Sequence, residues 1–431
     1  MRLALQLILA VLMAAPAVAN PLPAVPTGMK RWIVTFKPAV KAAGRDEALA
    51  ALNVKAQAQI ATNGNTDNEF SAAVVDLPAG QTLTKPAFAA QSNTPLAGIA
   101  SIEPDQRVKW IEQASVSFQS TPFGSAAAAL KFPDFKAIQA AAAAHPSQAS
   151  FLADRPELTW GVMRVHAPAA WDVTEGAGVK VAVIDTGIDL THPDLLGKVD
   201  GGYSAITKTE SPEDYQDDNG HGTHVSGTIA ALRDGKGVVG VAPKARLYAV
   251  KVLDADGSGN LSDVIDGIIW AAKNGMQVAN MSLGAPVDSP AMHRAVQYAT
   301  GMGMIIVAAA GNSGGSVGFP GAYPEVITVS ASDSQDHIAS FSSRGPQVKF
   351  IAPGVDVVSD KLGGGFVSYS GTSMATPHVT GLAALAVSQG WTGLGGPDGV
   401  LHQLQKAARP LPGLTADEQG AGMIDAGRLV H

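Results

Sequence analysis

Three polar residues far apart in the chain are of types that together can activate a serine. Asp185 follows the apolar run 179–184, His221 opens His-Gly-Thr-His-Val-Ser-Gly-Thr, and Ser373 lies in Gly-Thr-Ser-Met-Ala-Thr-Pro-His. A histidine can take the proton of a serine hydroxyl, while an aspartate orients the imidazole and stabilises its charge. Asn312, in Ala-Gly-Asn-Ser-Gly, adds a side-chain N–H that can stabilise an oxyanion. These residue types indicate acyl transfer through a serine nucleophile.

Each of these residues also has an ordinary structural interpretation. A serine at the start of a helix is often an N-cap, and Asn-Ser-Gly is typical of a turn. His221 and His224 could instead bind a metal, but the chain has no His-Glu-x-x-His pattern and no cysteine. If Ser373 does begin a helix, the free N–H groups and the dipole there favour negative charge nearby.

The elements that must position these residues alternate between strands and helices. Apolar runs typical of strands buried on both faces cover 179–184, 247–252, 304–309 and 326–329, and helical patterns cover 221–232, 261–274 and 291–300. This alternation predicts an α/β fold with a mostly parallel sheet and helices on both faces. In such folds, sites gather at the carboxyl ends of the strands.

The first part of the chain has a different pattern. Arg2, the apolar run 3–15 and the small residues 17–19 predict a signal peptide cleaved near Ala19, because the run is too short to span a membrane. Strands over 31–36, 70–77 and 99–111 and a helix over about 46–60 predict a small α+β domain of the split-βαβ type. The predicted organisation is therefore a signal peptide (1–19), this small domain (20–113), an alanine-rich linker (114–154) and the α/β domain (155–431).

Composition excludes several functions. The chain has 431 residues, of which 46% are hydrophobic, so a large core can form. The formal net charge of −7 argues against nucleic acid as a partner, because binding phosphates requires a basic surface. The absence of cysteine excludes disulfides, thiolate–metal sites and cysteine nucleophiles. No later segment is typical of a transmembrane helix, so we expect no membrane association after signal removal.

Four motifs together resemble the subtilisin family of serine peptidases. Val-Ala-Val-Ile-Asp-Thr-Gly-Ile-Asp, His-Gly-Thr-His-Val-Ser-Gly-Thr-Ile-Ala-Ala, Ala-Ala-Ala-Gly-Asn-Ser-Gly and Gly-Thr-Ser-Met-Ala-Thr-Pro-His-Val occur in the order of that family, and the resemblance covers 160–430. Chymotrypsin-like enzymes and α/β-hydrolases order their triads differently. The resemblance implies a secreted, monomeric serine endopeptidase with Asp185, His221 and Ser373 as its triad. It also implies an oxyanion hole made by Asn312, the Ser373 backbone and the Thr372 hydroxyl.

The resemblance also implies where an extended polypeptide substrate binds. The walls and base of the pocket before the scissile bond would be Ser282, Leu283, Gly284, Ala285, Ala309, Gly311 and Gly318. A second edge, further from the scissile bond, would contain Gly257, Ser258 and Gly259. Because Gly318 has no side chain, we expect a preference for bulky apolar residues before the cleaved bond.

Calcium is the cofactor that the resemblance implies, with a structural role. Its ligands would be the side chains of Asp194 and Asp234 and backbone carbonyls of Leu232, Lys236 and Val238, which give the oxygen-rich shell that calcium prefers. The acidic segment 210–218 could bind a second ion or could be a solvated loop. No organic cofactor is expected.

By the same resemblance, the segment from Arg31 to about Glu112 is an inhibitory propeptide that aids folding and presents its tail to the active site. Its cleavage would fall within 110–119, near Asp154, or at both places. Two alternatives differ in activity. One is a catalytically inactive binding or surface protein with the same fold, and the other is a sedolisin-type acid peptidase. The second would need a glutamate and an aspartate where His221 and Asn312 stand.

Overall fold

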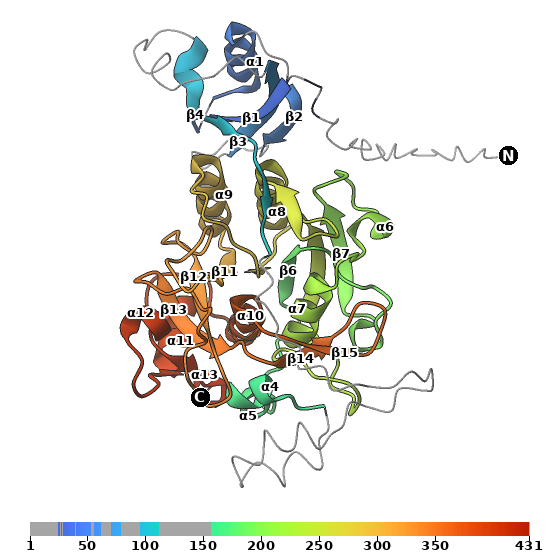
Figure 1. Cartoon of the computed structure of the whole chain (residues 1–431), viewed down its shortest axis with the longest axis vertical. Coiled ribbons are helices and arrows are strands. Elements are labelled where there is room, and N and C mark those ends of the chain that lie inside the picture. The colour runs from blue at the N-terminus through green and yellow to red at the C-terminus, as the bar shows by residue number, and fades with distance from the viewer. Residues whose placement is uncertain are drawn as a thin grey trace, which may run out of the picture.

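The computed structural model describes residues 25, 27, 29–38, 40–52, 56–61, 70–78, 95–111 and 157–430. The predicted signal peptide and alanine-rich linker lie outside these residues. A small sheet with one helix lies at one end of the molecule, and a large sheet flanked by helices forms the rest (Figure 1). Among the described residues, no helix is both long and apolar enough to cross a membrane.

The small sheet has the strand order of a split βαβ unit. It contains β1 (Met29–Phe36), β2 (Ala56–Ala61), β3 (Ser71–Pro78) and β4 (Ile99–Pro104) in the order β2-β3-β1-β4. Every neighbouring pair of strands is antiparallel. Helix α1 (Ala42–Ala51) follows β1, and a short 3-10 helix η2 (Pro95–Gly98) precedes β4.

The predicted helix over about 46–60 is wrong in its extent. Helix α1 begins earlier, at Ala42, and ends at Ala51. The sequence Ala-Gln-Ala-Gln-Ile that follows alternates apolar and polar residues, which suits a strand, and it pairs with β3. The hydrogen bonds of that pairing determine the structure of 56–61, whereas the apolar residues alone also fitted a helix.

The large sheet confirms the predicted fold class. Seven parallel strands lie in the order β13-β12-β11-β10-β6-β8-β7. Their bounds are β6 (Lys180–Asp185), β7 (Val199–Ser204), β8 (Arg246–Lys251), β10 (Val278–Met281), β11 (Ile305–Ala309), β12 (Ile327–Ser332) and β13 (Val348–Pro353). The strands β7, β10 and β13 were not predicted from the sequence.

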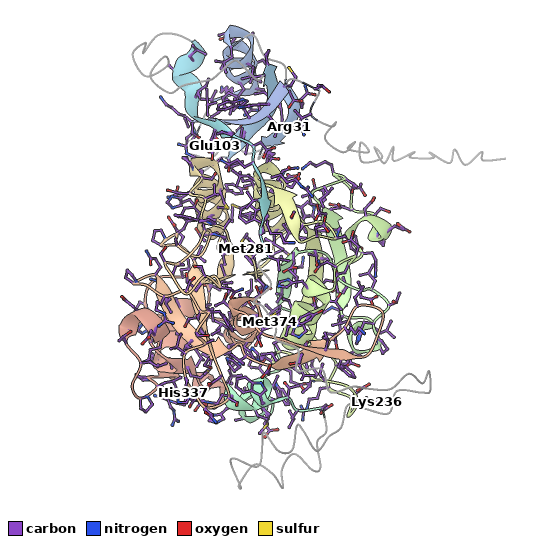
Figure 2. The ribbon with its side chains drawn as sticks, in the orientation of Figure 1. Arg31, Glu103, Lys236, Met281, His337 and Met374 are labelled. Carbon is purple, nitrogen blue, oxygen red and sulfur yellow. The ribbon has the colours of Figure 1, made fainter. Side chains whose placement is uncertain are left out.

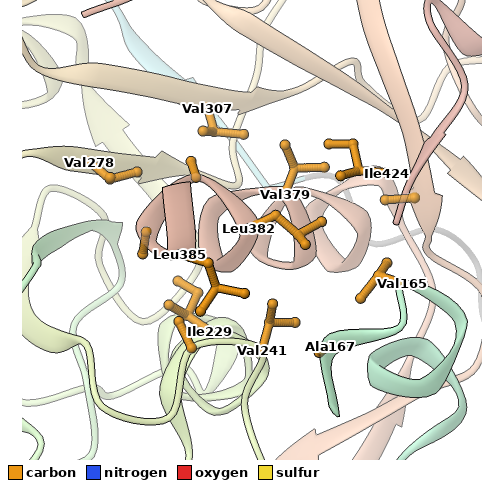
Figure 3. Close-up of a cluster of buried hydrophobic side chains, with 14 of the residues drawn as sticks. Val165, Ala167, Ile229, Val241, Val278, Val307, Val379, Leu382, Leu385 and Ile424 are labelled. Carbon is orange, nitrogen blue, oxygen red and sulfur yellow. The ribbon is translucent and has the colours of Figure 1, made fainter. Parts of the chain in front are cut away.

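Helices cover both faces of this sheet. Helices α7 (His221–Ala230) and α10 (Thr372–Ser388) pack on one face, and α8 (Leu261–Lys273) and α9 (Pro290–Gly301) pack on the other. In β6, Val181 and Val183 belong to the apolar cluster that includes α7 and α10. Ala182 and Ile184 belong to the cluster on the other face, which includes α8 and α9. Figure 3 shows α10 between the strands that carry Val278 and Val307 and the segments that carry Ile229 and Val241. A continuous apolar run therefore gives a strand with two buried faces.

Shorter elements complete the large domain. They are α4 (Trp160–Arg164), α5 (Ala167–Ala170), η3 (Pro193–Leu195), α6 (Pro212–Tyr215), β14 (Val357–Asp360), β15 (Phe366–Tyr369), α11 (Val400–Ala407), β16 (Ala408–Arg409), α12 (Ala416–Gln419), β17 (Met423–Ile424) and α13 (Ala426–Leu429).

The small domain is joined to the large one by strand pairing and by two helix caps. Strand β5 (Arg107–Lys109) pairs antiparallel with β9 (Ser258–Asn260) of the large domain. The carboxylate of Asp105 accepts hydrogen bonds from the backbone N–H and hydroxyl of Ser262 at 2.9 and 2.8 Å, at the start of α8. Glu103, at the junction seen in Figure 2, accepts one from the N–H of Ala291 at 2.8 Å, at the start of α9. Two carboxylates of the small domain therefore satisfy free N–H groups of two helices.

Candidate active site

Asp185 and His221 form a buried pair at the edge of the large sheet. Asp185 is the last residue of β6 and His221 is the first residue of α7. The imidazole Nδ1 lies 2.8 Å from Oδ1 and 3.0 Å from Oδ2 of Asp185. The helix approaches this close because residue 222 is glycine: a Cβ there would lie 2.1 Å from the carbonyl oxygen of Gly187. The pairing leaves Nε2 as the nitrogen that can act as a base.

The protonation of His221 follows from its surroundings. Burial lowers the pKa of the imidazole, but the charge and hydrogen bond of Asp185 raise it, with a further contribution from Asp217. The net effect holds the pKa of His221 above its ordinary value. A raised pKa suits a base that must hold a proton briefly during acyl transfer.

Asp217 is a buried residue beside the Asp185–His221 pair that the sequence indicated only as part of the acidic segment 210–218. Its Oδ1 accepts hydrogen bonds from the Thr186 hydroxyl at 2.9 Å and from the N–H groups of Asn219 and Gly220 at 3.0 Å each. Its Oδ2 accepts from the N–H and hydroxyl of Thr223 at 3.0 and 2.6 Å. One buried carboxylate thus connects the turn after Asp185 to the first turn of the His221 helix.

Ser373 lies in the first turn of α10, and 7% of its surface is exposed. Its hydroxyl donates to the carbonyl oxygen of Ser282 at 2.9 Å. His221 Nε2 is buried and has no hydrogen-bond partner among the described residues. The structure therefore joins Asp185 to His221 but does not form the bond between Ser373 and His221. Such bonds are often absent without substrate and form in the complex.

A chain of polar side chains fixes the backbone around the serine, and sequence reasoning missed its first member, Asn280. The amide of Asn280 donates to Ser282 Oγ at 2.9 Å, and that hydroxyl donates to the carbonyl oxygen of Ser373 at 2.8 Å. The hydroxyl of Thr380, on α10, donates to the amide oxygen of Asn280 at 2.8 Å. Strand β10 and the start of α10 are thereby held together beside β6.

Asn312 is held by the residue that precedes the serine. Its amide oxygen accepts hydrogen bonds from the N–H and the hydroxyl of Thr372, both at 2.9 Å. The Thr372 hydroxyl also accepts from the N–H of Gly311 at 3.1 Å. Because the oxygen of the amide is fixed in this way, the orientation of its NH2 group is fixed too. In this structure Thr372 positions Asn312.

The residues predicted for the first substrate pocket come together through backbone hydrogen bonds. Ala285 and Phe319 exchange two bonds, at 3.0 and 2.8 Å, and the N–H of Gly318 donates to the carbonyl of Ala310 at 3.0 Å. The backbone of Gly318 lies against Ala285, where a Cβ would meet the carbonyl oxygen at 3.3 Å. The segments 282–285, 308–311 and 318–319 therefore adjoin one another, next to Ser373.

The tail of the small domain lies on the predicted second substrate edge. Beyond the β5–β9 pairing, the N–H groups of Trp110 and Ile111 donate to the carbonyl of Gly257 at 3.1 and 3.3 Å. On the opposite side, the N–H of Gly284 donates to the carbonyl of Trp110 at 3.1 Å. Residues 107–111 thus lie as an extended strand between 257–260 and Gly284.

The predicted calcium segment contains buried carboxylates close to backbone polar groups. Asp194 accepts a hydrogen bond from the N–H of Val238 at 2.8 Å, and Glu157, which the sequence reasoning missed, accepts from the N–H of Gly235 at 2.7 Å. Burial raises the pKa of Asp194, and the charges of Asp234 and Glu157 add to that effect. Within the described residues, no three acidic or histidine side chains converge tightly enough to form a metal site by themselves. The negative charge that Asp234 and Glu157 add next to Asp194 is the observation in this segment that favours a bound cation.

Two alternative metal interpretations lack support in the arrangement. Each carboxylate of 210–218 accepts a hydrogen bond from a protein group. The donors are Trp270 to Glu210, Ser211 to Glu213, Thr209 to Asp214, Thr223 to Asp217 and Lys251 to Asp218. These carboxylates therefore have partners within the protein, and Asp217 among them is buried. Burial lowers the pKa of His224 to about 3, and its Nε2 donates to the Val357 carbonyl at 3.0 Å. His221 and His224 therefore face different partners.

The candidate site thus combines the edge of a parallel sheet, a buried Asp–His pair and a serine at the start of a helix. The chain belongs to the subtilase family, whose model, described as "Subtilase family", matches residues 176–422. The family prediction is therefore confirmed.

Curated relatives include several subtilisins. Subtilisin Savinase of Lederbergia lenta is 53% identical over 230 residues, which are 53% of this chain and 83% of that protein. M-protease of Shouchella clausii (strain KSM-K16) is 53% identical over 230 residues, and the match spans 59% of its length. Subtilisin E of Bacillus subtilis (strain 168) is 51% identical over 238 residues, or 54% of this chain and 61% of its own length.

Proposed function

We propose that this protein is a serine endopeptidase that hydrolyses peptide bonds through an acyl-enzyme. The observation that carries the proposal is the buried Asp185–His221 pair, in which Nδ1 is bound and Nε2 is left to act as the base. Ser373, which lies at the start of α10, supplies the hydroxyl. Two of the compared relatives are named alkaline proteases, which agrees with this activity.

The proposed reaction has two stages. The Ser373 hydroxyl turns from Ser282 to His221 Nε2, gives up its proton and attacks the substrate carbonyl carbon. Asp185 stabilises the resulting imidazolium, which then protonates the leaving amine. Water repeats the sequence on the ester and releases the acid. In both stages the oxyanion accepts hydrogen bonds from the Asn312 amide and the Ser373 N–H, beside the positive end of the α10 dipole.

Pre-steady-state hydrolysis of a peptide nitrophenyl ester tests this function. An acyl-enzyme predicts a burst of nitrophenol equal to the enzyme concentration, followed by slower turnover. A protein of the inactive, binding type would give neither burst nor turnover. Absence of both would refute the proposal.

Removal of the oxyanion donor should slow the chemistry. Asn312→Ala is expected to lower kcat by about 10²–10³-fold, equivalent to about 2.7–4 kcal/mol, with little change in KM. This magnitude is the one known for the corresponding loss in subtilisin. Single-turnover acylation measures it, and Asn274→Ala, at the end of α8, is a control that should react like the wild type. Unchanged acylation by Asn312→Ala would exclude this role.

The substrate is proposed to be an extended polypeptide with a bulky apolar residue before the scissile bond. Segments 282–285, 308–311 and 318–319 would form that pocket, and 257–260 would pair with the residues further upstream. The residues 20–113 are proposed to be an inhibitory propeptide, since the tail 107–111 already lies on this edge. Its carboxylates Glu103 and Asp105 would assist folding by capping α9 and α8. We also propose that the protein is secreted as a monomer after its signal peptide is removed near Ala19.

Calcium is proposed as a structural ion, held by the side chains of Asp194 and Asp234 and by carbonyls of Leu232, Lys236 and Val238, with Glu157 as a further acidic neighbour. The bound ion would supply charge neutralisation to this loop. A chelator should lower the Tm of the Ser373→Ala protein by roughly 5–10 °C if calcium otherwise stands at about a hundred times its Kd. Asp194→Asn should remove most of the difference between chelator and calcium. A Tm indifferent to both would contradict the proposal.

A further inference from the structure

The tail of the small domain shows how a strand of alternating residues fits the β9 edge. Register pairs Arg107 with Asn260, Val108 with Gly259 and Lys109 with Ser258. Trp110 faces the protein: its side chain belongs to the cluster that contains Leu261, it is 1% exposed, and its Nε1 donates to the Gly259 carbonyl at 3.0 Å. Arg107 and Lys109, two residues apart, share the opposite, exposed face.

Both cations of this face meet one acidic turn. The Arg107 guanidinium forms an ion pair with the Asp254 carboxylate, and the Lys109 ammonium donates to the carbonyl of Asp256. The turn 254–258 is closed by two backbone hydrogen bonds of 2.9 Å between Asp254 and the residues Gly257 and Ser258. Oxygens of the turn therefore contact two successive side chains on one face of the added strand.

Hydrogen bonds from its own turn fix the orientation of the Asp254 carboxylate. Its Oδ1 accepts from the N–H groups of Asp256 at 2.9 Å and Ser258 at 3.1 Å, so Oδ2 is directed to Arg107. Burial tends to raise the pKa of Asp254, but the bond to Arg107 and those two N–H groups outweigh it and lower the pKa. A fixed and charged carboxylate loses little conformational freedom when a basic side chain binds.

We propose that the turn 254–258 is a specificity subsite that selects polypeptide substrates with basic residues opposite Asn260 and Ser258, at alternate positions upstream of the cleaved bond. The proposal rests on the proposed function, because it takes the tail as occupying the path of a substrate. Asp254 is the specificity-determining side chain, and the Asp256 carbonyl supports the second basic residue.

We expect a modest preference for basic residues at the position of Arg107, and we expect it to weaken as the salt concentration rises. The Arg107 side chain is 56% exposed and that of Asp254 28% exposed, so the pair is partly screened by water. An exposed ion pair of this kind corresponds to about 1.5- to 5-fold in kcat/KM at low ionic strength, and less near 1 M salt. Replacing the attracted arginine by glutamate adds repulsion, so the ratio of arginine to glutamate peptide should reach about 10-fold.

The test uses internally quenched peptides built on 104–113 of this chain, with arginine, glutamine or glutamate at the position of Arg107. The enzyme produced from the full chain is compared with Asp254→Asn, Asp254→Lys and the control Asp398→Asn, an exposed aspartate far along the sequence. Mass spectrometry establishes that the same bond is cut in each peptide. We expect the wild type and the control to prefer arginine, Asp254→Asn to lose the preference, and Asp254→Lys to prefer glutamate.

The outcomes separate the two proposals. Equal kcat/KM for all three peptides in the wild type, or a preference that survives in Asp254→Asn or in 1 M salt, overturns the subsite while leaving the peptidase function in place. Cleavage of no peptide by any of these proteins overturns both. Reversal of the preference by Asp254→Lys supports the subsite directly, because a loss of folding cannot invert a ratio.

Discussion

Ser373→Ala should abolish peptide hydrolysis, with kcat falling by roughly 10⁶-fold, the magnitude known for loss of the serine in subtilisin. Alanine has no hydroxyl to attack the carbonyl, while the oxyanion donors and the substrate edge remain. The same change should leave the expressed chain at its unprocessed mass if maturation is intramolecular. Steady-state kinetics and intact-mass spectrometry measure the two effects.

The control for this change lies on the same helix. Ser388, at the other end of α10, bonds Thr174 and the carbonyl of Leu385 and lies away from His221. Ser388→Ala should keep its catalytic constants and lose only some stability. A Ser373→Ala protein that still cleaved peptides at the wild-type rate would rule out serine catalysis at this position.

Asp185→Asn should have the second largest effect, a loss of about 10⁴-fold in kcat. The amide cannot accept two contacts from Nδ1 as the carboxylate does at 2.8 and 3.0 Å. The imidazole would then carry its proton on Nε2 and could not accept the one from Ser373. Measurement of kcat for this variant and for the exposed Asp172→Asn, as a control, gives the size of the effect.

The pH profile of Asp185→Asn tests independently whether Asp185 raises the pKa of His221. In the folded enzyme the pKa of His221 is raised, chiefly by Asp185 against the effect of burial, so the charged form persists to higher pH. Activity needs the neutral form, and kcat/KM of the wild type should therefore rise with pH through a midpoint above the usual value for histidine. Loss of the Asp185 charge should move the residual activity's midpoint to lower pH. A midpoint that stays in place, or moves upward, would show that Asp185 does not stabilise the imidazolium.

Four of the seven strands of the large sheet could be predicted from the sequence because they are buried on both faces. Val181 and Val183 pack on one side and Ala182 and Ile184 on the other, so the run is apolar throughout and independent of register. For the segment 56–61 the sequence prediction was wrong, because the alternation of apolar and polar residues is short there. Pairing with β3 determines its structure. Strand β10 has only four residues, one of them the polar Asn280, so its pattern gave no clear periodicity.

Candidate site residues could be proposed from the sequence where they lie in local motifs, but not where hydrogen-bond networks connect them to the site. Asp185, His221, Asn312 and Ser373 lie in recognisable local sequences. Asp217, Asn280 and Glu157 do not, because their importance arises from hydrogen bonds to residues up to 100 positions away, such as the bond between Thr380 and Asn280. A buried polar residue of this kind becomes visible only when its partners are known.

Labelling by a fluorophosphonate, followed by peptide mapping, tests most directly whether His221 activates Ser373. We expect one adduct per molecule, on Ser373, at a rate that falls sharply in His221→Ala and is unchanged in Ser388→Ala. An adduct on a different residue, or labelling of Ser373 at the same rate without His221, would contradict the claim that these side chains act as one catalytic unit.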